Sequence, residues 1–513
     1  MRIAGLAIVL VGVMFGLAML FLHAYLKRSI VAILQDRFQS EVQINNLQTA
    51  IFPRVSATAD DITLHLKGSG DAPPMITIRR LTVSANIVAL MVGHISSVHL
   101  EGLQIRIPPH PPSTGQGIKR GKRIRFPLVI DQITSDDALL ETLPSDAKHV
   151  AHDFDIHHVV LGSFSFDSPA SFSATLTNPV PKGEIESQGR FGPWVAEQPG
   201  ETAVSGKFVF SNADFSSIHG LSGTMSSEGK YSGTLDKINV EGDTKMSDFA
   251  LAFAGNPMPL TTHYVAVVDG TTGNTYLQSV EAHLGQSPIS VKGEIVGVPG
   301  MKGRHVMLEA TSRGGRAQDL LHLAVKGPPP VDGTMDLHTT IDLPPAPGGG
   351  NDVVGSLSLD GAMDIASGHF TNSGVQTKLD SLSRAGRGEP KDSEIQDVIS
   401  NMQAKFVVGH GMAHLSGVSF EVPGATVQMD GSYGMQSGDI DFHGHLILDA
   451  KLSQTTTGIK SDILKLFDPL FKKPGGGSSI PIAVTGNRTH PMIGPDFSGK
   501  SRANSKQQSM ARP

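Results

Sequence analysis

The segment Ile440–Leu452 decides the fold class of this chain, and it reads IDFHGHLILDAKL. Apolar residues and polar residues alternate along most of it, with Ile447 as the exception. Alternation with a period of two places successive side chains on opposite faces of a β-strand. The segment therefore predicts a strand with one apolar face and one polar face, which antiparallel sheets tolerate and fully buried parallel sheets do not.

The same pattern recurs elsewhere, in Met335–Leu343, Val353–Ile365 and Phe249–Phe253. Several of these runs are longer than the usual strand of about 5–6 residues, and glycines inside them predict bends or bulges. These glycines are Gly355, Gly361 and Gly444. We expect a mainly β fold: a long, curled antiparallel β-sheet, open as a groove or half-barrel, with a few amphipathic helices.

The apolar faces of these strands are mainly aliphatic, because aromatic residues make up only 5% of the chain. An aliphatic trough suits a lipid acyl chain, and it equally suits the core of an ordinary β-sandwich. The residues predicted to line a lipid groove are Phe249, Leu251, Phe253, Leu337, Ile341, Leu357, Leu359, Phe442, Leu446 and Leu448.

A membrane anchor is predicted at the start of the chain. Residues Ile3–Leu22 contain no charged or polar side chain, and twenty helical residues span about 30 Å, the thickness of a hydrocarbon core. A cleaved signal peptide is the alternative, but its apolar region is usually shorter and ends in small residues. Positive charges flank both ends of the segment, so they do not settle on which side of the membrane the large domain lies.

Two helices are predicted from apolar residues at helical spacing. One covers Pro390–Gln403, with Ile395, Val398, Ile399 and Met402 on one side. The other covers Ile459–Phe471 and carries several lysines, so it can lie on an anionic membrane as well as plug the end of the sheet. Its predicted membrane-facing or lid residues are Ile459, Ile463, Leu466 and Phe467.

A basic segment interrupts the strands at Pro108–Arg125. Its cationic cluster could bind lipid phosphates, although a solvated loop is the simpler interpretation. The predicted head-group ligands are Lys119, Arg120, Lys122 and Arg123.

Composition and motifs give no support to catalysis. The formal net charge is −6, so no overall positive field attracts nucleic acid. No cysteine is present, which excludes disulfides, thiolate metal sites and cysteine nucleophiles. No G-x-S-x-G or H-E-x-x-H motif occurs. Residues 152–158 (HDFDIHH) could seed a metal site, but polar strand faces carry many of the 21 histidines. We predict no enzyme, no metal and no cofactor.

The N-terminal third resembles the AsmA family of envelope proteins. In this chain, the predicted anchor is followed by the segments IFPRV (51–55), DITL (61–64), ITIRRLTV (76–83), ALMVGHI (89–95) and VHLEGLQIRI (98–107), in the order found in that family. Residues 400–497 resemble the family loosely, through their strands and the segment GNRTHP (486–491). The resemblance implies a single-pass anchor in the inner (cytoplasmic) membrane, a body in the periplasm, and a relation to bridge-like lipid-transfer proteins.

We therefore expect an envelope protein whose β-groove binds membrane lipid or transfers it between membranes, contributing to outer-membrane biogenesis. A non-catalytic scaffold that receives strands of outer-membrane proteins is the alternative, and an envelope hydrolase is a third. Other envelope proteins are possible partners, and nucleic acid is not expected. The predicted divisions are an anchor (1–28), an AsmA-like region (29–107), the basic linker (108–125), a central β region (126–385), an AsmA-like C-terminal region (386–485) and a largely disordered tail (486–513).

Overall fold

The computed structural model describes part of the chain: residues 40–50, 55–66, 74–86, 88–89, 92–107, 129–142, 152–165, 167–195, 198–252, 255–299, 301, 303–325, 327–345, 353–391, 397–457, 464–465 and 468–496. Several predicted features lie outside these residues: the anchor, the basic linker, Phe253, and the lid residues Ile459, Ile463, Leu466 and Phe467. Within the described part, no helix has the length and apolar character needed to cross a bilayer.

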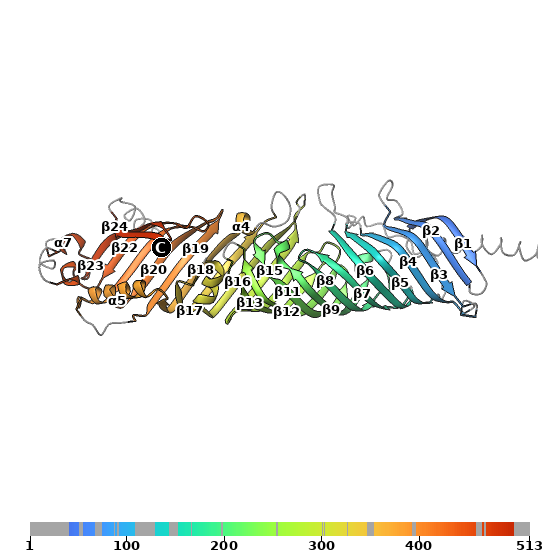
Figure 1. Cartoon of the computed structure of the whole chain (residues 1–513), viewed down its shortest axis with the longest axis horizontal. Helices are drawn as coiled ribbons and strands as arrows, with labels where there is room; N and C mark the ends of the chain where they lie inside the picture. Colours follow the sequence, from blue (N-terminus) through green and yellow to red (C-terminus); the bar gives the residue numbers. More distant parts are fainter. Residues whose placement is uncertain are drawn as a thin grey trace, which may run out of the picture. The chain divides into compact units, whose positions relative to one another are not determined.

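The fold is mainly β, as predicted, and its strands form one mostly antiparallel sheet that does not close (Figure 1). The described strands are β1 (Ser40–Ala50), β2 (Val55–Leu66), β3 (Ile76–Ala85), β4 (His94–Ile107), β5 (Val129–Thr142), β6 (His152–Phe164), β7 (Ala170–Pro179), β8 (Lys182–Phe191), β9 (Ala203–Asp214), β10 (Leu221–Ser222), β11 (Thr224–Thr234), β12 (Lys237–Leu251), β13 (Met258–Val268), β14 (Thr275–Leu284), β15 (Ser287–Gly297), β16 (Arg304–Arg316), β17 (Val331–Leu343), β18 (Ser358–Phe370), β19 (Ser400–Gly409), β20 (Met412–Val422), β21 (Ala425–Gly434), β22 (Asp439–Leu448), β23 (Ser478–Asn487) and β24 (His490–Pro495).

The chain divides into two units. Unit 1 comprises residues 1–213, 226–242 and 266–275, and unit 2 comprises residues 214–225, 243–265 and 276–513. The predicted six-part division of the sequence stays a prediction.

In unit 1, strands β1 to β8 pair in chain order. All of these pairs are antiparallel except β4 with β5, which run parallel and are joined by residues 108–128. The apolar side chains of the first strands form one cluster on a single face, with Val42, Ile44 and Leu47 of β1 packed against Ile62 and Leu64 of β2. β1 is the edge strand of this unit among the described residues, since β2 is its pairing partner.

In unit 2, strands β15 to β24 form an uninterrupted antiparallel meander in chain order (Figure 1). Among the described residues, the helices of this unit are inserts between strands: η2 (Phe215–Ser217), α3 (Ala317–Ala324), α4 (Val353–Ser356), α5 (Ser373–Arg387), η3 (Leu452–Thr455) and α7 (Asp468–Phe471). The hairpin of β23 and β24 extends the sheet as far as Pro495, so the sheet continues into the segment 486–513 that the sequence predicts as a largely disordered tail.

Bulges recur in alternate strands of unit 2. Gly314 in β16, Ser367 in β18 and Gly417 in β20 have left-handed backbone conformations, with φ of 64°, 55° and 58°. The pairing register shifts at each of them. A bulge adds one residue to one strand and increases the local twist. The prediction of bulges at particular glycines is wrong, because Gly361 and Gly444 pair in continuous register with their neighbours and Gly355 lies in α4.

Glycines inside the strands of unit 2 make room for aromatic rings. A Cβ atom on Gly361 would lie 2.8 Å from Cζ of Phe406, and one on Gly431 would lie 2.6 Å from Cγ of Phe442. Each glycine pairs directly with its phenylalanine across the ladder. The ring lies over the neighbouring strand, where any larger residue would collide with it. Gly361 therefore serves this close approach, whereas Gly355 belongs to α4.

Two predicted strands have different ends in the structure. The strand predicted at Val353–Ile365 begins only at Ser358, because α4 occupies Val353–Ser356. The strand predicted to reach Leu452 stops at Leu448, and η3 follows it.

The helix predicted at Pro390–Gln403 is wrong, because residues 400–403 belong to β19 and 397–399 form no helix. The longest described helix is instead α5, which begins after its N-cap Asn372 and ends before Gly388, a C-cap in the left-handed conformation.

The replacement Gly431→Ala should destabilise unit 2 by about 1–3 kcal/mol, because the new methyl group would collide with the backbone oxygen of Asp441 and the ring of Phe442. Urea unfolding followed by circular dichroism measures this change. Gly409→Ala is the matched control, since no atom lies within 4 Å of a Cβ at that strand residue. Equal stability of the two variants would contradict the ring-over-glycine packing.

Candidate functional site

The apolar face of unit 2 is a candidate binding surface, because its side chains form continuous rows across the ladder. In one row, five directly paired residues run from β19 to β23: Met402, Phe420, Val427, Leu446 and Ile480. Cross-strand neighbours on one face have Cβ atoms about 4.5–5.5 Å apart. The row is therefore an unbroken apolar band that crosses five strands.

A second row runs parallel to the first. It contains Phe406, Leu415, Gly431, Phe442 and Val484, again in direct register from β19 to β23. All members of both rows are only partly buried. Apolar residues in a closed core are normally excluded from water almost completely, so these rows retain surface that another apolar group could cover.

Two helices cover one part of this face. α3 packs Ala317 and Leu321 against Met335 and Ile365 of the sheet. α5 joins the cluster that contains Val422, Ala425 and Leu448. Among the described residues of strands β15 to β24, each strand makes extensive contacts only with its ladder neighbours and with helices. A second sheet that would make this face an ordinary sandwich core is thus not found among them.

The predicted groove residues occupy different positions with respect to this face. Ile341 pairs with Leu359, and both are partly buried, as are Leu337, Phe442 and Leu446. Leu448 is only 3% exposed, since it packs under α5, so it is a core residue.

The remaining groove predictions lie away from the rows. Leu357 precedes β18 in the chain and is partly buried. Phe249 and Leu251 end β12, where Leu251 pairs with Leu221 of β10. The sequence prediction missed Phe406, Phe420 and Val484. For Phe406 and Val484, the alternation of apolar and polar residues in β19 and β23 contained this signal, whereas Phe420 of β20 lies beyond the bulge at Gly417.

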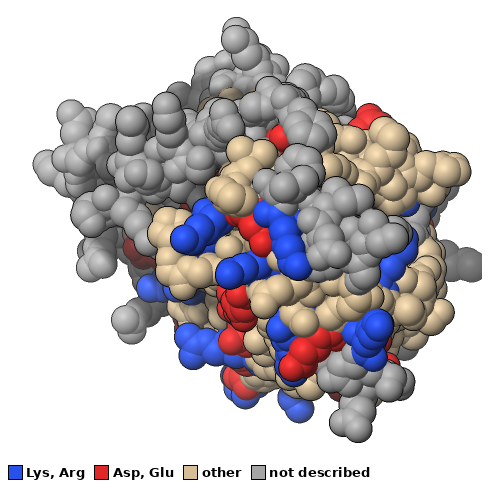
Figure 2. All heavy atoms as spheres, turned by 90° about the vertical axis from the view of Figure 1, so that its left-hand side faces the viewer, with Lys and Arg blue, Asp and Glu red and all other residues tan. Residues whose placement is uncertain are grey.

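Charged side chains of both signs are interspersed where unit 2 carries α7, β23 and β24 (Figure 2). Exposed cations such as Lys472 and Arg488 share this region with exposed acids such as Asp439 and Asp449. A surface of mixed sign produces no strong field for a polyanion. This part of the described surface therefore does not favour nucleic acid as a partner.

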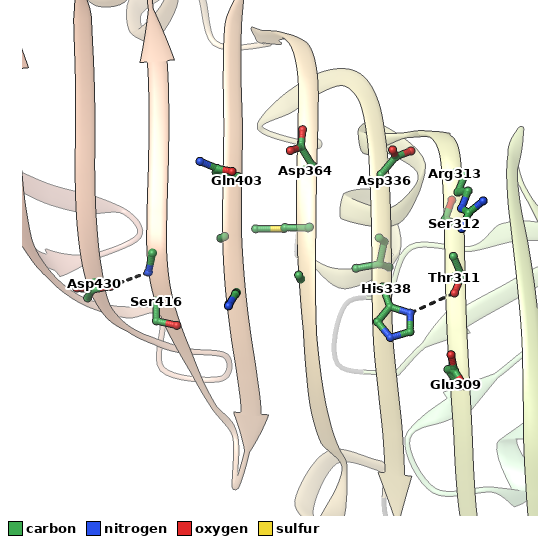
Figure 3. A pocket seen from close by; sticks show the side chains of 16 residues that line it. Glu309, Thr311, Ser312, Arg313, Asp336, His338, Asp364, Gln403, Ser416 and Asp430 are labelled. Carbon is green, nitrogen blue, oxygen red and sulfur yellow. Dashed lines mark hydrogen bonds between the residues drawn. The ribbon is translucent and has the colours of Figure 1, made fainter. Parts of the chain in front are cut away.

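The polar face of unit 2 has a shallow hollow of about 1150 Å³ across strands β16 to β21. Its labelled side chains come from successive strands and spread along the sheet, rather than converging on one point (Figure 3). Its lining includes four carboxylates and two cationic side chains: Glu309, Asp336, Asp364, Asp430, Arg313 and Lys405. Lys292 donates to Glu309 at 2.9 Å and lowers the pKa of that carboxyl group.

Two of these acids have a structural role at the bulges. Asp336 accepts a hydrogen bond from the backbone N–H of Gly314, and Asp430 accepts one from Gly417, both at 2.7 Å. At the intermediate bulge, the amide oxygen of Asn401 accepts from Ser367 at 3.2 Å. A bulge leaves one N–H without a ladder partner, so these side chains satisfy that donor.

The histidines of the polar faces pair with carboxylates on neighbouring strands. His158 lies 2.6 Å from Asp136, and His157 lies 3.5 Å from Glu184, so these two ring nitrogens turn toward different strands. The segment 152–158 was the only metal site that the sequence suggested. In the described part of the chain, no group of three or more potential ligands could hold a metal ion.

The last strand, β24, has an edge that is poorly suited to accept another strand. The backbone N–H of Asp496 donates to Pro481 of β23 at 2.9 Å, so by alternation the odd-numbered residues of β24 face outward. These are Pro491, Ile493 and Pro495, and two of the three lack an N–H. The carboxylate of Asp496 also holds the imidazole of buried His443 at 2.9 Å. This geometry does not favour the scaffold hypothesis at this edge.

Comparisons with known proteins leave the family open. No protein-family model matches the chain, and no curated protein matches it significantly. The resemblance to the AsmA family therefore stays an expectation from the sequence phrases.

The replacement Asp430→Ala should lower the free energy of unfolding by about 1–2 kcal/mol, because it removes a charged acceptor from the Gly417 N–H. Asp430→Asn should cost clearly less, since Asn401 makes the equivalent bond at the Ser367 bulge. Urea unfolding of the three proteins measures the order. Equal losses for Ala and Asn would show that the hydrogen bond is not the stabilising feature.

Proposed function

We propose that this chain is an envelope protein, anchored in the inner membrane with its body in the periplasm, that holds lipid acyl chains on the apolar face of its β-sheet. In this proposal the sheet curls into an open groove or half-barrel and passes lipids between membranes, contributing to outer-membrane biogenesis. The observation that carries it is the pair of continuous, partly buried apolar rows across β19 to β23.

The energetics favour an acyl chain as the occupant. Removing one CH₂ group from water contributes about 0.8 kcal/mol, so a chain that lies along several strands gains substantial free energy. The rows are aliphatic with scattered phenylalanines, and their members carry no charge or polar side-chain group. Such a surface offers contact without hydrogen bonds, which suits hydrocarbon and leaves a head group in water at the rim.

The polar side chains support binding rather than catalysis. In the hollow on the polar face, Asp336 and Asp430 satisfy bulge N–H groups. A hydrolase needs a nucleophile, a base and an orienting group within hydrogen-bond reach of one another. Lipid transfer requires no covalent step, so it needs no such constellation.

Photocrosslinking tests the position of the lipid. A benzophenone side chain in place of Phe406 should form lipid adducts in the cell, because Phe406 lies in the apolar row. The same group in place of the adjacent Val407 is the matched control, since Val407 is 50% exposed and lies on the opposite face of β19. Mass spectrometry identifies the adducts. Equal lipid labelling at both positions, or adducts with protein alone at Phe406, would refute the proposal.

A charge on the apolar face should reduce the amount of bound lipid. Ile341→Asp should lower lipid that co-purifies with the full chain by about tenfold, a difference of about 1.4 kcal/mol. Thr340→Asp is the control, because Thr340 is the exposed neighbour on the polar face. Quantitative lipid analysis measures both, and circular dichroism confirms that each variant is folded. Unchanged lipid in a folded Ile341→Asp protein would count against the groove.

A further inference from the structure

The connection between β3 and β4, residues 86–93, is unusually apolar for a hairpin tip. It reads NIVALMVG, with six consecutive apolar residues. Among the described residues of this tip, Val88 is 73% exposed and Val92 is 68% exposed. Connections between strands normally carry Gly, Asn, Asp, Ser and Pro, and large exposed apolar side chains are normally scattered singly. Two exposed valines in one uncharged tip therefore require an explanation.

Hydrogen bonds hold the backbone of the described residues of this tip. The N–H of Val88 donates to the side chain of Asn86 at 2.9 Å, and the N–H of Val92 donates to the carbonyl of Ala89 at 3.1 Å. Gly93 follows with φ of 83°, and its carbonyl accepts from the N–H of Val129 at 3.0 Å. The two valines are therefore exposed although hydrogen bonds fix their backbone.

The topology of unit 1 places the start of β5 at the base of the tip, where Val129, the first residue of β5, pairs with His94. In the sequence, the basic cluster ends at Arg125, four residues before Val129. Apolar side chains accompanied by nearby Lys and Arg are typical of segments that lie at a membrane interface, where cations meet lipid phosphates.

The predicted anchor leaves this tip within reach of the same bilayer. Seventeen residues separate Leu22 from Ser40, the first residue of β1. Fully extended, they reach at most about 60 Å. β3 is separated from β1 by β2 alone, and the register places the tip beside Ala50, at the end of β1 opposite to Ser40. The eleven residues of β1 extend about 35 Å, which is less than the reach of the connection.

We propose that the β3–β4 tip is a membrane-docking element, whose apolar side chains enter the boundary between head groups and acyl chains of the bilayer that holds the anchor. The inference rests on the membrane anchor of the proposed function, but not on lipid carriage by the apolar face. A second point of attachment, besides the anchor, fixes the orientation of β1 to β4 against the bilayer.

The chain contains no cysteine, so a single introduced thiol can be labelled cleanly. The full chain with Val88→Cys or Val92→Cys is labelled with the dye NBD and reconstituted in vesicles of phosphatidylethanolamine and phosphatidylglycerol. NBD emission should be shifted to the blue relative to the same label at position 180 in the same vesicles, and lipids with a nitroxide near the head group should quench it at least twofold. Val180→Cys is the matched control, since Val180 is also an exposed valine (61%) at a hairpin, between β7 and β8.

Two results would overturn the proposal. One is an NBD label at position 88 or 92 that stays as polar and as unquenched as the label at 180. The other is a blue shift without quenching by nitroxide lipid, because that would place the tip against protein. Incorporation of the protein into the vesicles, measured by flotation, reports on the anchor separately. Lipid bound on the apolar face is quantified in the same samples, so failure of lipid carriage and failure of docking are distinguishable.

Discussion

The constraint on which the rest of this structure depends is that every strand must present its apolar residues on the same face of the ladder. In a strand the side-chain period is two, so a shift of one residue would move the whole apolar set to the other face. The bulges show how the chain keeps the phase. Leu415 and Val418 of β20 lie three residues apart, yet the register shifts between them at Gly417, and the alternation continues on each side. A side chain from the next strand, that of Asp430, then satisfies the N–H that the bulge releases.

The same constraint explains the pairing of glycine with phenylalanine. A ring that lies over the neighbouring strand leaves no room for a side chain there, because the strands are only about 4.8 Å apart. Gly361 beside Phe406 and Gly431 beside Phe442 avoid that collision, and each ring covers the backbone of its neighbour. The apolar face can therefore be continuous with few aromatic residues. It is smooth where glycine lies under a ring, which is compatible with a flexible ligand that contacts many strands weakly.

Sequence reasoning found the strands with clean alternation and failed where polar contacts decide the structure. The segment around Phe442 and Leu446 was predicted correctly because its period is unmistakable. α5 was missed because the side chains that it buries include Gln376, Asp380 and Ser383. The carboxylate of Asp380 accepts from the backbone N–H of Val398, and Ser383 donates to the carbonyl of Pro423. The fully buried positions of α5 are thus mainly polar, and apolar spacing alone does not single it out, although Leu382 packs against the apolar cluster and the caps, Asn372 and Gly388, were readable.

The false helix at Pro390–Gln403 has the complementary cause. Val398 and Met402 have helical spacing, but Val398 is buried against α5 while Met402 belongs to the apolar row of β19. Short apolar spacings fit a helix and a strand entry equally well, and only the partner that covers them decides. The sequence also could not predict which groove residues would be accessible, for a similar reason. Which side chains remain partly exposed depends on where α3 and α5 lie, and no local pattern in the strands encodes that.

Unit 2 leaves two surfaces that another molecule could cover, the edge of β24 and the apolar face of the sheet. The residues at these two surfaces differ in kind, and this difference bears on function. The open edge at β24 carries prolines at two of its three outward positions, which removes the donors that an added strand would need. The apolar face has no comparable protection: no charge interrupts the rows from β19 to β23. A protein that recruited client strands would leave its edge free, and one that only had to stay soluble would cover or charge its face. Blocking the edge while keeping the face apolar is the combination that a carrier of hydrocarbon needs, since its ligand uses dispersion and burial and offers no backbone to pair.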